Sequence, residues 1–517
     1  MLLHTFQTLP PRSVVILGLG VENQQFLKWA VEVAEIPAET FVLADRTPLT
    51  PEKIRQMGFC LQEMGFDQNQ EFFGDHYLES LKRKENLYVL KAPGIWSEAK
   101  YLQDFRETKG LDKVISPLHF FVERFKNQII GVSGTKGKTT TAGLIAHLLN
   151  ELIGYEGIYC GNSTNISPYT FWTTLDFKPP AETYFVIELS SFQLQDLGYS
   201  KLSPARAVLT NYFIDHLDQH ASKEEYWHAK DNLYLHQEEP KLFVTEQLPE
   251  YVQNHARSVL TSNLTKTLLA HLRVPLLGQH NRTNLALALT VLADVSEDEI
   301  EEFVILERDK LQRGLDSFEN LPYRYELVRQ NSRSIVLAGT PKHFLLRFIN
   351  DGAATEPEAV KASIKASTET SNAFLWVQFT GVDKGVDPSP IITEILKIQA
   401  KNQLYRADYC GQIGQKILQT IYQKMKVPIT VSPENFRQII ESDFVSLTQI
   451  TKDFERWLNE LHANLVSIEA TEQLAVLENH SDYILNVVLS PGGSSFDEFK
   501  NYIERSNFWS TKVETLS

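Results

Sequence analysis

One glycine-rich stretch constrains the fold of this chain more than any other part of it. Residues 131 to 141 read Gly-Val-Ser-Gly-Thr-Lys-Gly-Lys-Thr-Thr-Thr, with an apolar, β-rich run before them and a helical pattern of alanine and leucine after them. Strand, glycine turn, Gly-Lys-Thr and helix is the layout of a phosphate-binding loop, in which backbone N–H groups and the helix N-terminus surround phosphate oxygens. Lys138 is placed to reach terminal phosphates, and Thr139 to ligate Mg²⁺ through its hydroxyl. The loop is a shorter variant of the strict pattern, and a glycine-rich turn without a ligand is the alternative.

Length and charge limit the classes of protein that the chain can belong to. At 517 residues it exceeds what one core usually supports, so about three domains are expected. A net charge of −15 argues against nucleic-acid binding and against attraction to anionic membranes. The sequence has no run of 18 apolar residues, so no membrane insertion is expected. Cys60, Cys160 and Cys410 are widely spaced, which fits a reducing cytoplasm.

The first 125 residues have a Rossmann-like beginning. A strand at 13–17 runs into Gly18-Leu19-Gly20, a helical pattern follows, and a second strand at 41–46 ends in Asp45-Arg46. Asn23 stands where the dinucleotide-binding pattern has its third glycine. Ligand binding and a plain tight turn between strand and helix are equally compatible with this stretch.

Residues 126 to 321 alternate strands and helices around the phosphate-binding loop. A strand at 184–188 delivers Glu188 at its carboxyl end, a strand at 205–209 leads to His216, and a later helix carries Lys230. In open α/β sheets, ligands lie beyond the carboxyl ends of the strands. Each of these residues is a weak signal alone, but together with Lys138 they indicate phosphoryl chemistry on Mg-ATP.

From residue 322 the alternating pattern begins again. Short strands are expected at 325–328 and 334–337, another ends near Asp351, and further strands are expected at 374–379 and 483–489. We therefore predict an α/β fold of three domains: a Rossmann-like domain at 1–125, a central ATPase-type parallel sheet at 126–321 and a C-terminal Rossmann-like domain at 322–517.

The sequence resembles the Mur ligase family over nearly its whole length, and within it the members that add glutamate. The residues that carry the resemblance are Gly134 to Thr141, Glu188 to Leu194, Asp215 to Asp218, Tyr226 to Lys230, Gly278 to Asn281, Asp383 to Gly385, Leu489 to Pro491 and Phe499 to Asn501.

The resemblance implies an ATP-dependent amide ligase of peptidoglycan precursor synthesis. Its substrates would be UDP-N-acetylmuramoyl-L-alanine and glutamate, most simply D-glutamate, and an acyl phosphate would be the intermediate. It would use ATP and two Mg²⁺ ions, and we expect a cytoplasmic monomer that binds neither nucleic acid nor membrane.

The resemblance also implies the site residues. Catalysis would depend on Lys138, Glu188, His216 and Lys230. The Mg²⁺ ligands would be Thr139, Glu188, His216 and a carbamylated Lys230. ATP would contact Gly134, Thr135, Lys136, Gly137, Lys138, Thr139, Thr140, Asn281, Arg324 and Asp351. The UDP-linked substrate would contact Gly18, Leu19, Gly20, Val21, Asp45, Arg46, Thr47, Asn165 (with Asn162 the second choice), Ser190 and Gln193. The incoming glutamate would contact Thr355, Lys384 and Ser495.

Departures from the family pattern leave the amino acid open. Lys136 stands where the family loop has asparagine, and Ala353 replaces a lysine in the stretch from Asn350 to Glu356. Glu356 brings a negative charge to a place where an anionic substrate is expected. The alternatives are a sibling Mur or folylpolyglutamate-type ligase, a variant that adds L-glutamate or another amino acid, and a nucleotide-binding protein that has lost catalysis.

Overall fold

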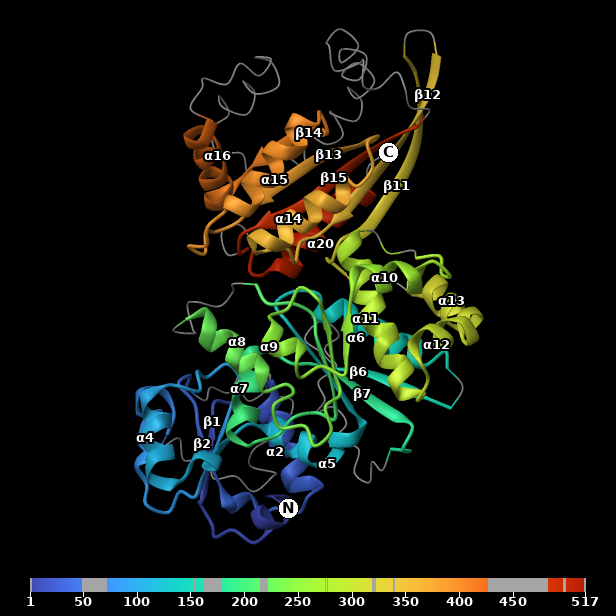
Figure 1. Cartoon of the computed structure of the whole chain (residues 1–517). Helices are drawn as coiled ribbons and strands as arrows, with labels where there is room; N and C mark the ends of the chain where they lie inside the picture. The colour runs from blue at the N-terminus through green and yellow to red at the C-terminus, as the bar shows by residue number, and fades with distance from the viewer. Residues whose placement is uncertain are drawn as a thin grey trace. The chain divides into compact units, whose positions relative to one another are not determined.

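The computed structural model describes residues 2–48, 72–152, 154–160, 179–213, 222–274, 276, 278–318, 322–337, 340–425, 482–495 and 499–515. Three β-sheets with their helices are seen in these residues (Figure 1). The chain divides into two compact units, one of residues 1–273 with 283–318 and one of residues 274–282 with 319–517. The first two sheets belong to the first unit and the third sheet to the second, so the α/β class predicted from the sequence is confirmed.

The first sheet has four parallel strands in the order β2-β1-β3-β4. Its strands are β1 (Val14–Leu17), β2 (Phe41–Ala44), β3 (Tyr88–Lys91) and β4 (Val114–Ile115). Its helices are α1 (Leu2–Gln7), α2 (Val21–Glu32), α4 (Lys100–Lys109) and α5 (Pro117–Phe125), with short 3₁₀ turns at Ala38–Thr40, Gly74–Lys82, Leu111–Lys113 and Lys126–Gln128. Successive β1 side chains enter different cores: Ile16 packs with α2 and α5, and Leu17 packs with α4. The strand is therefore buried on both faces, as a parallel strand between helices must be.

The second sheet has six parallel strands in the order β10-β9-β8-β5-β7-β6. Its strands are β5 (Ile129–Ser133), β6 (Glu156–Cys160), β7 (Thr183–Glu188), β8 (Arg206–Leu209), β9 (Leu242–Thr245) and β10 (Ser258–Leu260). Its helices are α6 (Lys138–Leu149), α7 (Ser191–Tyr199), α8 (Lys223–Asp231), α9 (Glu250–Gln253), α10 (Ser262–Leu269), α11 (Gln279–Val295), α12 (Ile300–Leu306) and α13 (Arg308–Ser317). The glycine-rich stretch joins β5, a central strand, to α6, a helix that is buried along most of its length. The ends of β8 and β7 consequently lie on either side of the loop.

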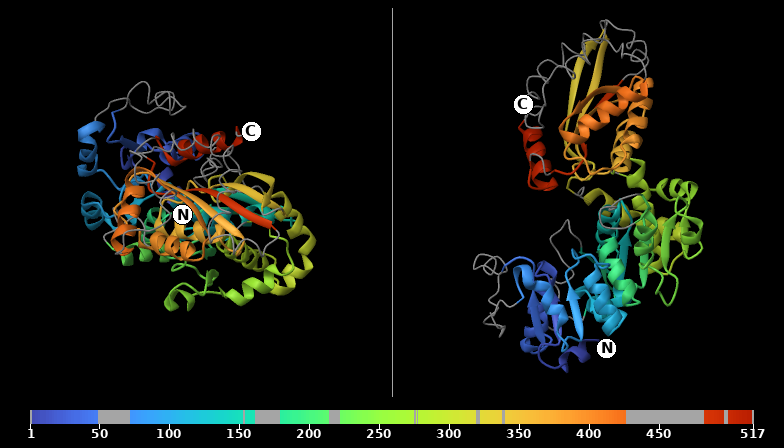
Figure 2. Two further views of the ribbon diagram at one scale, coloured as in Figure 1. Left: turned by 90° about the horizontal axis from the view of Figure 1, so that it is seen from above. Right: turned by 90° about the vertical axis from the view of Figure 1, so that its left-hand side faces the viewer.

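The third sheet has five strands in the order β11-β12-β15-β13-β14. Its strands are β11 (Glu326–Leu337), β12 (Thr340–Asn350), β13 (Ala373–Thr380), β14 (Leu404–Tyr409) and β15 (Asp482–Gly492). Its helices are α14 (Pro357–Ser367), α15 (Ser389–Ala400), α16 (Gly411–Met425) and α20 (Tyr502–Glu514). Figure 2 shows α20 on one face of the sheet and α14, α15 and α16 on the other. Phe348 and Ile349, neighbours on β12, accordingly belong to the two different cores.

The third sheet differs from the expectation at its edge. The two short strands expected at 325–328 and 334–337 are parts of the single long strand β11, which pairs antiparallel with β12. An edge strand pairs on one side only, so its sequence need not be continuously apolar, and its apolar pattern is a weak signal. In the described part of the chain, no helix is long and apolar enough to cross a membrane.

Candidate active site

The loop between β5 and α6 has the backbone that its glycines predict. Gly134 has φ of 137°, and a Cβ atom there would lie 2.0 Å from Thr210 Oγ1. Gly137 has φ of 83°, and a Cβ atom there would lie 2.6 Å from Asn284 Oδ1. Both positions therefore require glycine, for backbone conformation and for space. Gly137 is also the residue that precedes the first turn of α6, which begins at Lys138.

Residues at the end of β8 hold this loop from the side. Asn211 Oδ1 accepts the backbone N–H of Lys136 at 2.9 Å, and Asn211 Nδ2 donates to the Lys136 carbonyl at 2.9 Å. Thr210 Oγ1 donates to the same carbonyl at 2.5 Å, and the Asn211 carbonyl accepts the N–H of Thr135 at 3.1 Å. The Lys136 backbone is thus fixed by side chains of a neighbouring strand end. The sequence offered no motif for Thr210 or Asn211 because the sheet order, not the sequence distance, brings them to the loop.

The two residues that begin α6 face different groups. Lys138 Nζ donates to the carbonyl oxygens of Gly134 and Thr135 at 2.9 and 3.0 Å, so the ammonium lies over the loop. Thr139 Oγ1 donates to Glu188 Oε2 at 2.9 Å, and the Tyr159 hydroxyl donates to the other carboxylate oxygen. A hydroxyl beside a carboxylate, next to a phosphate-binding loop, is the hard oxygen donor set that Mg²⁺ prefers. Thr139 and Glu188 are therefore the residues that would hold one Mg²⁺, and this site stays a prediction.

Lys230 shares the Gly134 carbonyl as an acceptor with Lys138. It is buried on α8, its Nζ donates to the Gly134 carbonyl at 3.1 Å, and the ammonium lies 4.6 Å from the centre of the Tyr226 ring. Tyr226 in turn donates its hydroxyl to Thr135 Oγ1 at 3.2 Å. Among the described residues, no three His, Cys, Asp or Glu side chains gather as a metal site. His216 lies outside the described residues, so the second Mg²⁺ site stays a prediction.

Asp231, the neighbour of Lys230, fixes the end of α8. Its buried carboxylate accepts hydroxyl hydrogen bonds from Tyr212 at 2.5 Å and Tyr234 at 2.7 Å. Burial, and after it the charge of Asp231, raise the pKa of both tyrosines above the ordinary value, so both stay protonated donors. Sequence reasoning missed this cluster, because an Asp next to a Lys on a helix usually indicates a solvated surface.

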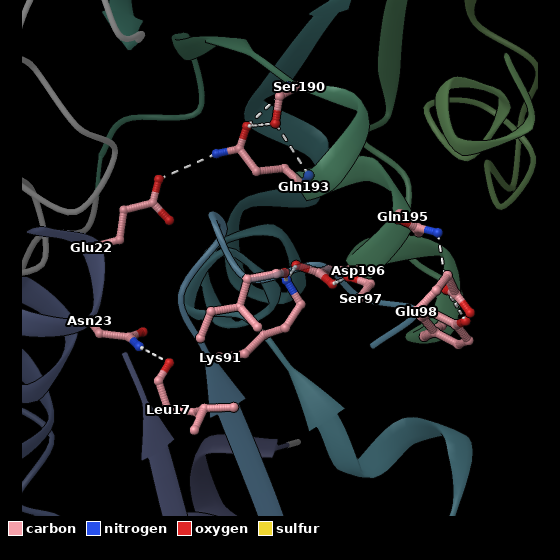
Figure 3. Close-up of polar contacts among 12 residues, drawn as sticks. Leu17, Glu22, Asn23, Lys91, Ser97, Glu98, Ser190, Gln193, Gln195 and Asp196 are labelled. Carbon is pink, nitrogen blue, oxygen red and sulfur yellow. Dashed lines mark hydrogen bonds and ion pairs between the residues drawn. The ribbon is translucent and has the colours of Figure 1, made fainter. Parts of the chain in front are cut away.

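The residues of the first sheet that were predicted to contact the UDP-linked substrate lie at the carboxyl ends of β1 and β2. Asp45 Oδ2 accepts the N–H of Leu19 at 2.6 Å, and Asp45 Oδ1 accepts the N–H of Thr47 at 2.7 Å. Asn23 Nδ2 donates to the carbonyls of Gly18 and Leu17 at 2.6 and 3.3 Å, the second of which is drawn in Figure 3. The Asp45 carboxylate and the Asn23 amide thus hold this turn together from within. Gly20 precedes α2, whose first residue Val21 is exposed, and Arg46 is also exposed.

Helix α7 links Glu188 to the first sheet. Ser190 and Gln193 form its capping box: Ser190 Oγ accepts the Gln193 N–H at 3.3 Å, and Gln193 Oε1 accepts the Ser190 N–H at 3.0 Å. Gln193 Nε2 also donates to Glu22 Oε1 on α2 at 3.3 Å (Figure 3).

A buried ion pair joins the same helix to the end of β3. Lys91 Nζ lies 2.7 Å from Asp196 Oδ2, and their side chains are 0% and 1% exposed. Ser97 Oγ donates to Asp196 Oδ1 at 2.5 Å (Figure 3). Because a buried ion pair is costly unless its geometry is maintained, it fixes α7 relative to the first sheet.

In the second unit, residues predicted for glutamate meet at the carboxyl ends of β12, β15 and β13. Lys384 Nζ donates to Thr355 Oγ1 at 3.2 Å and lies 2.6 Å from Glu356 Oε1. Ser495 is buried directly after Ser494, which pairs with Val382 just before Lys384 in the chain. The structure therefore brings Thr355 and Lys384 together, and Glu356 with them.

Three further residues were predicted to hold the ATP base, ribose and phosphates. Asp351 Oδ1 accepts the N–H of Tyr325 at 3.0 Å, which places Arg324 beside the end of β12. Asn281 is buried in the first turn of α11. Of the remaining predicted residues, Thr140 is buried in the first turn of α6, whereas Asn165 and Asn162 lie outside the described residues.

The chain is similar to known proteins in sequence and in fold. Residues 132–268 match the model of the Mur ligase middle domain. The UDP-N-acetylmuramoylalanine–D-glutamate ligase of Leptospira borgpetersenii is 25% identical, covering 98% of this chain and 97% of that protein. The UDP-N-acetylmuramoyl-L-alanine–L-glutamate ligase of Salinispora tropica is 31% identical, covering 51% of this chain and 55% of that protein. A pseudomurein peptide ligase type C from Methanothermus fervidus superposes with a TM-score of 0.45 at 14% identity, covering 97% and 99% of the two chains.

Proposed function

Because the chain belongs to the Mur ligase family of ATP-dependent enzymes, we propose that it joins glutamate to the alanyl carboxylate of UDP-N-acetylmuramoyl-L-alanine. The observation that carries the proposal is Lys138 over the loop, with Thr139 and Glu188 hydrogen-bonded beside it. Relatives that span nearly the whole chain are named for D-glutamate, which makes D-glutamate the first choice. L-glutamate is the second candidate, because the Salinispora relative is named for it.

The proposed reaction first makes the carboxylate a better electrophile. A carboxylate oxygen attacks the γ-phosphorus of ATP, the bond to the β-phosphate oxygen breaks, and ADP leaves. The glutamate amine then attacks the carbonyl carbon of the acyl phosphate, and the tetrahedral intermediate expels inorganic phosphate as the amine loses its proton. Lys138 neutralises the negative charge that develops on the transferred phosphoryl group. A Mg²⁺ held by Thr139 and Glu188 would add charge neutralisation and orientation of the phosphates.

We also propose that Lys230 acts as a carbamate and that, together with His216, it would hold a second Mg²⁺. An ammonium cannot bind a cation, whereas carbamylation converts it into an anionic oxygen ligand. Lys230→Ala should remove turnover, and acetate or propionate should restore part of it. The matched control is Lys223→Ala, at the exposed start of the same helix, which should keep full turnover. Full turnover by Lys230→Ala without added acid would contradict the role.

The other sheets would hold the remaining substrates. We infer that the first sheet takes the UDP-linked substrate through Gly18 to Val21 and Asp45 to Thr47, helped by Asn165, Ser190 and Gln193. Asn281, Arg324 and Asp351 would contact ATP, and Thr355, Lys384 and Ser495 the amino acid. This assignment keeps the predicted domains at 1–125, 126–321 and 322–517. A cytoplasmic location is part of the proposal, because the substrates are made with cytosolic nucleotides and the cysteines form no disulfide spacing.

Turnover with a panel of amino acids tests this function. The protein is given ATP, Mg²⁺ and UDP-N-acetylmuramoyl-L-alanine, and ADP release and product mass are measured with D-glutamate, L-glutamate, glutamine, aspartate and diaminopimelate. We expect ADP release and a product heavier by one glutamyl residue with D-glutamate. If neither D-glutamate nor L-glutamate supports ADP release, the proposal is contradicted. ADP release with L-glutamate alone would select the second candidate.

A further inference from the structure

The carboxyl end of the third sheet holds a cation and an acid of the protein itself. Lys384, which follows β13, lies 2.6 Å from the carboxylate of Glu356, which follows β12. In the sheet order β15 lies between β12 and β13, so Glu356 follows the strand on one side of β15 and Lys384 follows the strand on the other. The Lys384 side chain is 37% exposed and that of Glu356 is 4% exposed. The lysine side chain is therefore partly exposed, while the acid that pairs with it is buried.

The position of Glu356 is one that favours an anion. Glu356 directly precedes α14, an eleven-residue helix, and its side chain makes no capping hydrogen bond. The helix N-terminus and the Lys384 ammonium both attract negative charge to this place. In this protein, the negative charge found there belongs to Glu356.

The neighbouring charges have partners of their own. Asp383 Oδ2 lies 2.8 Å from Lys416 Nζ, and Asp383 Oδ1 accepts the N–H of Gly385 at 2.9 Å. Glu358 pairs with Lys361 at 3.0 Å, one turn along α14. The pairing of Glu356 with Lys384 is therefore distinct from these two pairs and is the one placed beside Thr355 and the Ser490–Ser495 stretch.

We propose that Glu356 is a specificity-determining residue that weakens selection for an acidic amino acid by occupying the Lys384 ammonium. This inference rests on the proposed function, in which Lys384 contacts the incoming amino acid, and it takes the side-chain carboxylate as the group that Lys384 receives. An entering carboxylate either shares Lys384 with a like charge or displaces Glu356, which leaves a buried carboxylate without its cation. Both outcomes are unfavourable. A neutral side-chain amide of the same length avoids most of this penalty.

The charge-removing substitution Glu356→Gln tests the inference in steady-state kinetics. The KM for glutamate should fall by about tenfold or more, because a buried like charge near a carboxylate is removed. The KM for glutamine and for ATP should change by no more than about twofold, so the effect lies in KM for the acidic substrate. The matched control is Glu358→Gln, which removes an acid two residues later and should leave all three KM values unchanged. An unchanged KM for glutamate in Glu356→Gln, or an equal fall in Glu358→Gln, would overturn the role of Glu356.

A measurement on the unaltered protein keeps the test independent of how well the variant folds. The kcat/KM for glutamate should exceed that for glutamine by less than about tenfold, since Lys384 is already paired. A preference for glutamate of more than about a hundredfold would contradict the inference. ADP release with none of the amino acids would instead overturn the proposed function, so the two failures are distinguishable.

Discussion

The phosphate-binding loop and the carboxyl end of the third sheet have similar positions in their sheets but differ in how tightly they are packed. Each lies beyond parallel strands and presents a lysine, Lys138 in one and Lys384 in the other. The loop backbone is packed tightly against neighbouring side chains, among them Thr210 and Asn284, which leave no room for a Cβ atom at Gly134 and Gly137. The third-sheet lysine is partly open to solvent and is held by one acid. The tightly packed loop has one fixed backbone conformation, whereas the environment of Lys384 depends on a single side-chain contact.

Removing the loop lysine should give the largest effect. Lys138→Ala is expected to lower kcat by about a thousandfold or more, because the charge that develops on the phosphoryl group loses its counterion. The control is Lys136→Asn, which removes a lysine two residues earlier in the same loop and should change kcat by less than about fivefold. Steady-state ADP release measures both, with far-UV circular dichroism to show folding. Unchanged turnover of Lys138→Ala would contradict the proposed phosphoryl transfer from ATP at this loop.

The buried ion pair behind α7 should give the next largest effect, this time on stability. Lys91→Met leaves the Asp196 carboxylate buried without its cation and is expected to cost about 3 kcal/mol of unfolding free energy. Lys100→Met removes an exposed pair with Asp104 and should cost less than about 0.5 kcal/mol. Urea denaturation of both variants makes the comparison. Equal costs would mean that the pair does not stabilise α7 against the first sheet.

Adding one methyl group to each site compares the two directly. Gly134→Ala should cost about 2 kcal/mol, since the new atom would meet Thr210 in a left-handed backbone. Gly385→Ala, next to Lys384, should cost about 1 kcal/mol, because its φ is 77° but no atom lies within 4 Å of the new group. Denaturation midpoints give both values. A larger cost at Gly385 than at Gly134 would contradict the difference in packing between the two sites.

The smallest expected effect concerns the hydroxyl that orients Glu188. Tyr159→Phe removes the hydrogen bond to the Glu188 carboxylate and should raise the Mg²⁺ concentration for half-maximal turnover by about tenfold. The control is Tyr155→Phe, whose hydroxyl donates to the Val295 carbonyl and not to Glu188. Turnover as a function of added MgCl₂ measures the shift. If both variants shift the Mg²⁺ concentration for half-maximal turnover equally, Tyr159 has no specific role at the metal site.

Local chemistry made part of this molecule predictable from sequence. The strand, loop and helix around Lys138 were predictable because the glycines, the lysine and the threonine act within a few residues of one another. Glu188 was predictable from a strand that ends in an acid, since parallel strands bring their carboxyl ends to one edge.

Contacts between distant segments were not predictable. Asn211 and Tyr159 reach the loop and Glu188 only because β8 and β6 take their places in the sheet. The negative charge of Glu356 was visible in the sequence, but its pairing with Lys384, 28 residues away, depends on the order of the third sheet. The long hairpin of β11 and β12 was missed because an edge strand carries a weak apolar pattern.

The proposed activation of a carboxylate at the phosphate-binding loop can be tested most directly with an isotope. UDP-N-acetylmuramoyl-L-alanine labelled with ¹⁸O in both alanyl carboxylate oxygens is turned over with ATP and glutamate, and the released phosphate is analysed by mass spectrometry. An acyl phosphate requires that each phosphate released carries one labelled oxygen, while the other label stays in the new amide. ADP and amide formed with no label in the phosphate would contradict the proposed reaction.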